Sequence, residues 1–468
     1  MIYIFSIAGA LLGFALNILL ARVLSLADLD KIKYLVALTT TLSNIFVVGL
    51  PSFIVREVNR PEQAKDFMSK CYSFFFFISL FIIPIVYYAL NNETVYTKDN
   101  PGLSFLVMGV SILMGVVSLV ASFFLGTKRF KSYYTIEIIF PKAIIILLCS
   151  IFVIAGLSTK ISNFYLLFYL IVYLLIDAFF LIKQFRSFTI HFNSREIVSI
   201  MVFFGTTITQ VLVSSLSTIL QSNMFPTIIG VTSTISTAAL LMSVVNVFTN
   251  VLSSIIKPFF AKHYIEKNDD KIVDYYRFGT RTNLYFAIPV YLFFIIFPKK
   301  FLMVFSSNLL IYPNILSIVA LTQLLSSLCG TTGALLSMIG EERKQLINVA
   351  IQFFVFATSV FILRKESVYG IVISTLISEI FVTVIKFFEV GIKYKQSPLD
   401  GKTIVSILLI IATNCGMILV FSFLQIDNLI IWFLLAIPIG IILLVLNILL
   451  TPYGKKDFNR LIHFKEEK

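Results

Sequence analysis

The chain has 468 residues, of which 58% are hydrophobic and only 13% are charged. Its mean hydropathy is +0.96. A chain of this composition is solvated mainly by lipid. The composition therefore excludes an ordinary soluble globular protein.

Apolar stretches of about 20 residues are long enough to cross a bilayer as helices. Fourteen such stretches follow one another along the chain, and no large soluble domain fits between them. The sequence predicts spans at 2–24, 34–55, 71–90, 102–125, 133–157, 163–182, 197–222, 233–256, 283–305, 312–339, 345–363, 370–392, 403–424 and 429–450.

Lys and Arg residues gather in every second connection, after the even-numbered spans and in the tail. Short cytoplasmic loops retain basic residues, so both termini are predicted to face the cytoplasm. The net charge of +13 is then a positive-inside bias with affinity for anionic headgroups, and not a sign of nucleic-acid binding. The longest of these connections, 257–281, is expected to be a short helix in the headgroup plane or a solvated loop.

Cysteine and histidine give no sign of a metal or a cofactor. Cys71, Cys149, Cys329 and Cys415 lie in or beside apolar spans, without a CxxC pair or a nearby histidine. The sequence has no Gly-x4-Gly-Lys-Ser/Thr phosphate loop, and its outer connections are too short to carry catalytic groups. We therefore expect no metal, no cofactor and no enzymatic activity.

The first span carries Gly9 and Gly13, four residues apart, on one face. Small residues at this spacing allow the backbone of another helix to approach closely. Ordinary tight packing is the expected role of this face.

Short motifs recur in the two halves of the chain. The fourth span ends in GTKR at 126–129 and the tenth in GEER at 340–343, and the end of the second span, 49–56, echoes 252–258. We interpret these echoes as two six-helix lobes with a two-helix appendix, a plan known among transporters. The predicted parts are an N-lobe at 1–186, a C-lobe at 187–394, and the appendix with a cytoplasmic tail at 395–468.

The order of these motifs resembles a known family. GFALNILLARVL at 13–24, Gly-Leu-Pro at 49–51 leading to Arg56, and the Gly-x-x-Arg helix ends are similar to those of polysaccharide flippases in the multidrug/oligosaccharidyl-lipid/polysaccharide exporter superfamily. The resemblance covers essentially the whole length. It implies an all-α, V-shaped polytopic exporter in the bacterial cytoplasmic (inner) membrane.

The resemblance also implies a cargo and partners. Members of this family move undecaprenyl-pyrophosphate-linked oligosaccharide units to the outer leaflet for O-antigen of lipopolysaccharide, capsule or other surface polysaccharide. The implied partners are this lipid-linked glycan, membrane lipids, and the polysaccharide polymerase and chain-length machinery. Two positions depart from the family pattern: SLAD at 25–28 follows Arg22 in place of Gly and an acidic turn, and QSN at 221–223 replaces an acidic–basic pair. The second departure speaks against carrying an ion-coupling role over to the seventh span. The coupling ion, H+ or Na+, stays open.

Charges at membrane depth cost about 2.5–3.5 kcal/mol each, so those that persist usually face a bundle interior or an aqueous cavity. Lys142 and Asp177 lie on consecutive antiparallel spans, each roughly 13 Å from the cytoplasmic boundary. One interpretation is an intramembrane ion pair. The others are that Lys142 contacts the pyrophosphate, or that it snorkels to the headgroups while Asp177 ends near the interface.

Neutral polar residues recur in the spans that the family fold brings around a central cavity. Sugar hydroxyls need neutral donors and acceptors, whereas a pyrophosphate needs cations. The alternative is that single amides bond across helices, at roughly 0.6 kcal/mol apiece. The predicted cavity residues are Asn17, Asn44, Gln210, Gln221, Asn246, Asn250 and Gln323, with Arg56, Lys142 and Lys257 for the pyrophosphate.

The leading hypothesis is a lipid-linked oligosaccharide flippase that works by alternating access. The first alternative is a multidrug or ion antiporter of the same superfamily, with twelve helices and a buried acidic site in the first lobe, for which Asp177 is available. A membrane glycosyltransferase or polymerase is disfavoured because no large outer loop exists. A scaffold without transport leaves the repeat unexplained.

Overall fold

A computed structural model gives the fold. It describes all residues except 1, 48, 58–63, 94–95, 99, 128, 185–228, 330, 340, 364–368, 398 and 463–468. The described residues form helices joined by short turns, with no strand among them, and they divide into two compact units, Met1–Ser236 and Thr237–Lys468.

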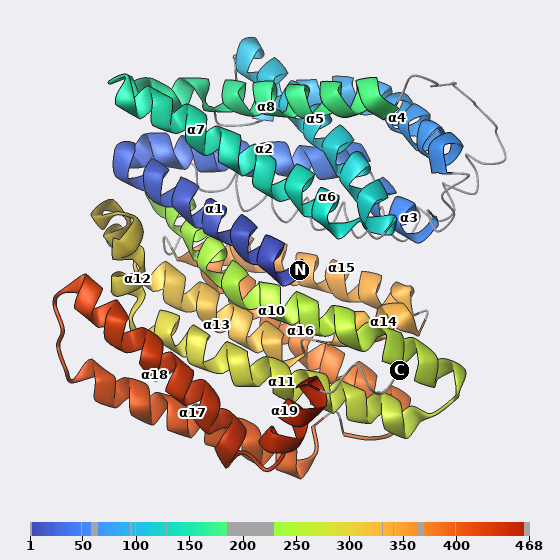
Figure 1. The fold of residues 1–468 in the computed structure, drawn as a ribbon, viewed down its shortest axis with the longest axis vertical. Helices are drawn as coiled ribbons and strands as arrows, with labels where there is room; N and C mark the ends of the chain where they lie inside the picture. The colour runs from blue at the N-terminus through green and yellow to red at the C-terminus, as the bar shows by residue number, and fades with distance from the viewer. Residues whose placement is uncertain are drawn as a thin grey trace. The chain divides into compact units, whose positions relative to one another are not determined.

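Helix α5 is the centre of the first unit. It packs against α2, α3, α4 and α8, and Figure 1 shows these helices, blue to green, as one bundle. The described helices of this unit are α1 (Ile2–Val23), α2 (Leu26–Val47), α3 (Leu50–Glu57), α4 (Ala64–Glu93), α5 (Pro101–Gly126), α6 (Phe130–Tyr134), α7 (Phe140–Ile154) and α8 (Ile161–Gln184), with the π-helical turn η1 (Thr135–Ile139) between α6 and α7.

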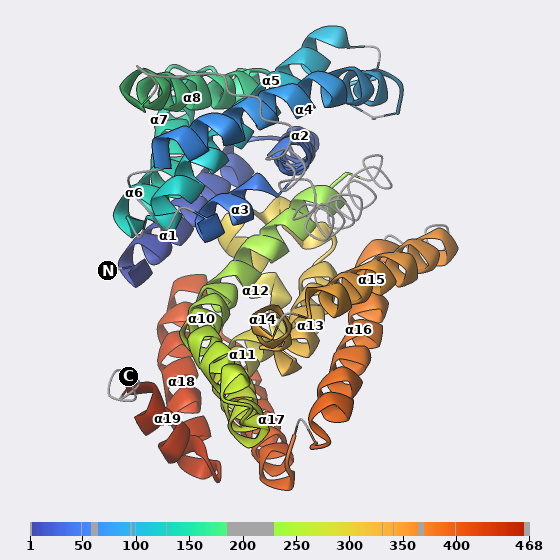
Figure 2. The same cartoon turned by 90° about the vertical axis from the view of Figure 1, so that its right-hand side faces the viewer.

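Helix α11 is the corresponding centre of the second unit. It packs against α13, α17 and α18, while α15 and α16 lie side by side (Figure 2). The helices are α10 (Val231–Ile265), α11 (Asp269–Ile296), α12 (Pro298–Phe305), α13 (Asn314–Leu328), α14 (Thr332–Met338), α15 (Glu342–Leu363), α16 (Gly370–Tyr394), α17 (Gly401–Ser422), α18 (Leu429–Leu450) and α19 (Gly454–Ile462).

Every predicted span except the seventh coincides with described helices, and the seventh, 197–222, lies outside the described residues. In the described part, nine helices are long and apolar enough to cross a membrane, or ten if α11 and α12, bent by 83°, form one broken span. Shorter apolar helices at Ala8–Val23 and Asn314–Leu328 add to them. The chain is therefore a multi-pass membrane protein with an all-α fold.

The second predicted span is not one continuous helix. Gly49 adopts a left-handed conformation with φ of 79°, so α2 ends at Val47 and α3 begins at Leu50. Glycine is suited to this break because it has no Cβ to clash at positive φ. Helix α10 continues unbroken through 252–258, so the echo between 49–56 and 252–258 does not reflect the same local structure.

The expectation for the connection 257–281 was wrong. Its second half is the start of α11, where Asn268 Oδ1 accepts the backbone N–H of Lys271 and caps the helix (3.2 Å). Ile272, Val273 and Tyr276 are fully buried in the hydrophobic core of the second unit. These apolar residues pack inward along α11 in the core of the second unit and do not form a separate helix exposed to lipid headgroups.

A buried ion pair fixes the last described helix. Arg281 on α11 donates Nε to Asp457 Oδ2 (2.7 Å) and Nη2 to Asp457 Oδ1 (2.9 Å), and the two side chains are 4% and 2% exposed. Tyr285 donates its hydroxyl to the same carboxylate (3.1 Å). The short helix α19 is thus tied to α11 and α18 within the second unit.

The predicted lobe boundary at 186/187 lies outside the described residues, so the lobes at 1–186 and 187–394 stay a prediction. The appendix helices α17 and α18 are not a separate body. Both pack on α11, and Asn447 of α18 donates its amide N–H to the carbonyl of Tyr285 (3.2 Å).

Candidate functional site

Lys142, on α7, reaches the backbone of α1. Its ammonium donates to the carbonyl oxygen of Gly9 at 3.0 Å. The approach is close because Gly9 has no side chain: a Cβ there would lie 2.5 Å from Cγ2 of Ile138 in η1. The predicted close-packing face of the first span is therefore real, and its partner is the π-helical turn before α7.

The predicted ion pair between Lys142 and Asp177 is not formed. Asp177 on α8 is 3% exposed, and neither of its carboxylate oxygens has a hydrogen-bond partner. The physical reason is that the ammonium of Lys142 finds the carbonyl of Gly9, which α1 brings close. Asp177 is thus a buried carboxyl group without the compensation that such groups normally have.

Sequence reasoning missed Glu137, a second acidic group in the same unit. It lies in η1, and its Oε2 is buried without a partner. Tyr173 on α8 lies within electrostatic range of both Glu137 and Asp177. A π-helical turn often marks a functional site, and a carboxylate four residues before Pro141 in an apolar span was the signal that could have revealed it.

In the second unit, one face of α10 carries a polar stripe. Asn246, Asn250, Ser253 and Lys257 follow one another at spacings of four, three and four residues, which places them on the same side of the helix. Asn250 is exposed and the other three are half-buried. We call this set the α10 stripe. It offers neutral donors and acceptors along the helix and a single cation at the end predicted to be cytoplasmic.

A neighbouring amide that sequence reasoning missed holds α10 in place. Asn283 of α11 is fully buried, accepts the hydroxyl of Thr249 at 2.7 Å, and donates to the carbonyl of Ser327 at 3.2 Å. It thereby joins α10, α11 and α13. Gln323 is half-buried on α13, one turn before Ser327. The helix that carries the α10 stripe is therefore bonded to α11 through Thr249, a residue that flanks the stripe.

The other predicted residues are dispersed. Asn17 on α1 donates to the carbonyl of Gly13 at 2.7 Å, and its Oδ1 is buried without a partner. Asn44 on α2 is exposed, and Arg56 is the next-to-last residue of α3. Gln210 and Gln221 lie outside the described residues.

The two repeated helix ends have structural roles. Gly126, at the end of α5, lies against the backbone of Ile54 and Val55 in α3, where a Cβ would be 3.2 Å from the Cα of Val55. In the second motif, Glu341 pairs with Lys344 (2.5 Å) and with Lys393 of α16. Desolvation by burial raises the pKa of Glu341, but the hydrogen bonds from these two lysines outweigh it and bring the pKa below its ordinary value.

Replacing Gly9 by Ala is expected to force α1 away from η1, because the new methyl group would overlap Ile138. Such overpacking typically costs about 1–3 kcal/mol. The measurement is the thermal unfolding midpoint of the purified protein in detergent. Gly416→Ala in α17 is the matched control, since a Cβ there meets nothing within 4 Å. A Gly9→Ala variant as stable as this control would contradict the close approach.

Among the residues that the structure describes, no group of three or more His, Cys, Asp or Glu side chains could hold a metal ion. Three ionisable groups of the first unit are not in ion pairs with one another: Lys142 binds a carbonyl, while both oxygens of Asp177 and Oε2 of Glu137 lack hydrogen-bond partners. Such an arrangement can bind a cation or a proton, or contact a phosphate.

No protein-family model matches this sequence, and no curated protein matches it either. Solved structures do match. The lipid II flippase MurJ in its inward closed conformation has a TM-score of 0.74 at 18% identity, over 99% of this chain and 100% of that one. An inward-facing multidrug resistance MATE family transporter of the MOP superfamily has a TM-score of 0.64 at 15% identity, over 83% of this chain and 94% of that one.

A third match is the MATE multidrug transporter DinF-BH, with a TM-score of 0.58 at 15% identity, over 85% of this chain and 96% of that one. At these identities the likeness shows the fold. The predicted all-α fold is confirmed, and it resembles the solved folds of this flippase and these transporters. The matched proteins are named as flippases or transporters, not as enzymes.

Proposed function

We propose that this chain is a flippase for lipid-linked oligosaccharides, which moves undecaprenyl-pyrophosphate-linked units across the bacterial cytoplasmic membrane by alternating access. The proposal includes cytoplasmic termini, as the distribution of basic residues indicates. Surface polysaccharide such as O-antigen or capsule is the proposed destination of the glycan, with a polymerase and chain-length machinery acting after it.

The observation that carries this proposal is the share of the chain that the match to the flippase structure covers. A match over 99% of the chain includes α17 and α18, whereas the two MATE matches leave 15–17% of this chain without a counterpart. Helices α17 and α18 thus have a counterpart in a protein named as a lipid II flippase. Lipid II itself is not proposed as the cargo of this chain.

The chemistry of the α10 stripe supports a sugar cargo. Amides and hydroxyls such as Asn246, Asn250 and Ser253 can donate to and accept from sugar hydroxyls. Lys257, at one end of the stripe, supplies a cation for the pyrophosphate. A drug transporter has less use for such a row, because its pockets are typically lined by apolar and aromatic side chains.

Lys257→Gln is expected to lower surface glycan about tenfold or more, because hydrogen bonds to charged groups contribute about 1.5–3 kcal/mol each. Arg56→Ala is expected to act in the same direction. The measurement is surface polysaccharide in cells that lack their own copy of the gene, together with lipid-linked glycan accumulating in the inner leaflet. Lys257→Arg should restore most of the activity.

Lys456→Gln on α19 is the matched control, because it removes one exposed cytoplasmic-side charge away from the stripe. Membrane abundance is measured for each variant. Full surface glycan with Lys257→Gln at normal abundance would remove Lys257 from the mechanism. Loss of drug resistance without glycan accumulation, upon deletion of the gene, would overturn the flippase proposal itself.

One observation favours a second candidate, a multidrug or ion antiporter. Asp177 is a buried acidic group in the first unit, and its two unpartnered oxygens could bind H+ or Na+. The same group also suits a flippase whose cycle is driven by an ion. The two candidates therefore differ in the cargo and not in the use of Asp177.

A further inference from the structure

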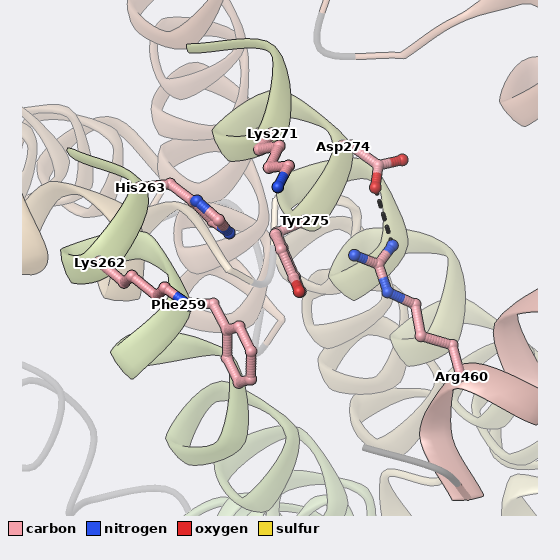
Figure 3. Close-up of a pocket in the computed structure, with 7 residues that line it drawn as sticks. All are labelled: Phe259, Lys262, His263, Lys271, Asp274, Tyr275 and Arg460. Atoms are coloured by element: carbon pink, nitrogen blue, oxygen red, sulfur yellow. Dashed lines mark hydrogen bonds and ion pairs between the residues drawn. The ribbon is translucent and has the colours of Figure 1, made fainter. Parts of the chain in front are cut away.

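A pocket of about 330 Å³ lies at the turn between α10 and α11, beyond the last residue of the α10 stripe, and none of the stripe residues lines it (Figure 3). Phe259, Lys262 and His263 line it from α10, and Tyr275 lines it from α11. Lys271 and Asp274 of α11 and Arg460 of α19 complete the wall. Three elements of the second unit thus contribute to one concave site.

The pocket is positively charged. Asp274 is its acidic member, and Nη1 of Arg460 binds that carboxylate at 2.8 Å. Lys262 and Lys271 are exposed, and neither ammonium group has a hydrogen bond or ion pair within the described part of the chain. Two ammonium groups are therefore left available to an anion at the mouth of the pocket.

The inner wall is aromatic and held in place. The ring of Tyr275 stacks on Phe259 with 4.9 Å between centroids and on His263 with 5.4 Å. The guanidinium of Arg460 lies 4.1 Å from the centroid of the same Tyr275 ring. A rigid wall with flexible cations in front of it suits a phosphate ester, whose oxygens meet the ammonium groups while its carbon body meets the rings.

The position of the pocket indicates the source of that phosphate ester. Helix α10 has 35 residues and is therefore about 52 Å long, whereas the hydrocarbon core of a bilayer is about 30 Å thick. The helix must project from the core, and its lysine-rich end belongs to the headgroup layer. Tyr264 and Ile265, next to the pocket, are 45% and 81% exposed, as expected for residues that contact lipid.

We propose that this pocket binds the headgroup of an anionic phospholipid of the cytoplasmic leaflet, with Lys262 and Lys271 on the phosphate. Basic pockets at the cytoplasmic ends of membrane helices are known to recognise such headgroups. Free phosphate shares the chemistry, but the exposed apolar residues beside the pocket favour a lipid. This inference concerns a second ligand and does not depend on the cargo.

The test is a titration of the purified full-length protein in detergent with phosphatidylglycerol, followed by native mass spectrometry. The double variant Lys262→Gln/Lys271→Gln is expected to bind this lipid roughly 10- to 30-fold more weakly, from about 1 kcal/mol per basic residue. Lys455→Gln/Lys456→Gln on α19 is the matched control, because it removes the same charge from exposed positions outside the pocket. It should bind as the wild type does.

Equally weakened lipid binding in both double variants would show that general surface charge, and not the pocket, attracts the lipid. That result would overturn the proposal. Unchanged binding in the pocket variant would overturn it as well. If millimolar inorganic phosphate displaces bound phosphatidylglycerol as effectively as added lipid does, the pocket binds a free anion and the lipid proposal is overturned. Thermal unfolding midpoints, measured for all variants, separate lost binding from lost folding, and no transport assay is involved.

Discussion

Replacing Asp457 by Asn is expected to lower the free energy of unfolding by about 3–5 kcal/mol, the usual cost of removing one partner of a buried ion pair. Arg281 would remain inside the protein without the carboxylate that accepts two of its hydrogen bonds, keeping the bond to Thr403 Oγ1 (3.2 Å). Tyr285 would lose the carboxylate that accepts its hydroxyl. The measurements are the thermal unfolding midpoint in detergent and the abundance in membranes.

Asp274→Asn is the matched control for this prediction. Its carboxylate also binds an arginine, Arg460, at 2.8 Å, but Asp274 is 54% exposed and water can replace the interaction. Exposed ion pairs contribute about 0–1 kcal/mol. A small loss with Asp457→Asn, comparable to this control, would show that α19 is not anchored by the buried pair.

The membrane spans could be predicted because length and hydropathy are local properties of the sequence. Nearly every span was found in this way. The breaks within them were harder to predict. Gly49 interrupts the second span through its own backbone conformation, and Gly-Leu-Pro was recognised only as a motif, not as a helix break. The start of α11 at Asp269 was missed because charged residues alternate there with apolar ones that pack against distant helices.

The candidate site was only partly predictable, for a related reason. The sequence analysis named Asn246, Asn250 and Lys257 as separate cavity residues, and their spacing within the continuous helix α10 places them on one face, since helical periodicity is local. Pairing between helices is not local. Equal depth in the membrane predicted an ion pair between Lys142 and Asp177, but the ammonium of Lys142 binds the carbonyl of Gly9 instead. Gly9 lies 133 residues away in the sequence, and no local pattern indicates that contact.

Asp177 contributes nothing to the fold that the structure can identify. A buried polar group that lacks a hydrogen bond lowers stability by about 1–3 kcal/mol. Groups that weaken a fold in this way persist where function needs them. Among the described residues of the first unit, we therefore propose the carboxyl group of Asp177, with Tyr173 and Glu137 nearby, as the site for a coupling cation or proton.

Asp177→Leu is accordingly expected to retain or raise the thermal unfolding midpoint while abolishing transport, measured as surface glycan at equal membrane abundance. Asn447→Leu provides the contrast in stability. Asn447 is 1% exposed, accepts the amide of Asn414 at 2.7 Å and donates to the carbonyl of Tyr285 at 3.2 Å, so its loss should cost about 1–3 kcal/mol. Normal transport by Asp177→Leu would exclude this residue as the coupling site. A large loss of stability would mean that the carboxyl group has a structural partner after all, because an unpartnered group has no bond to lose.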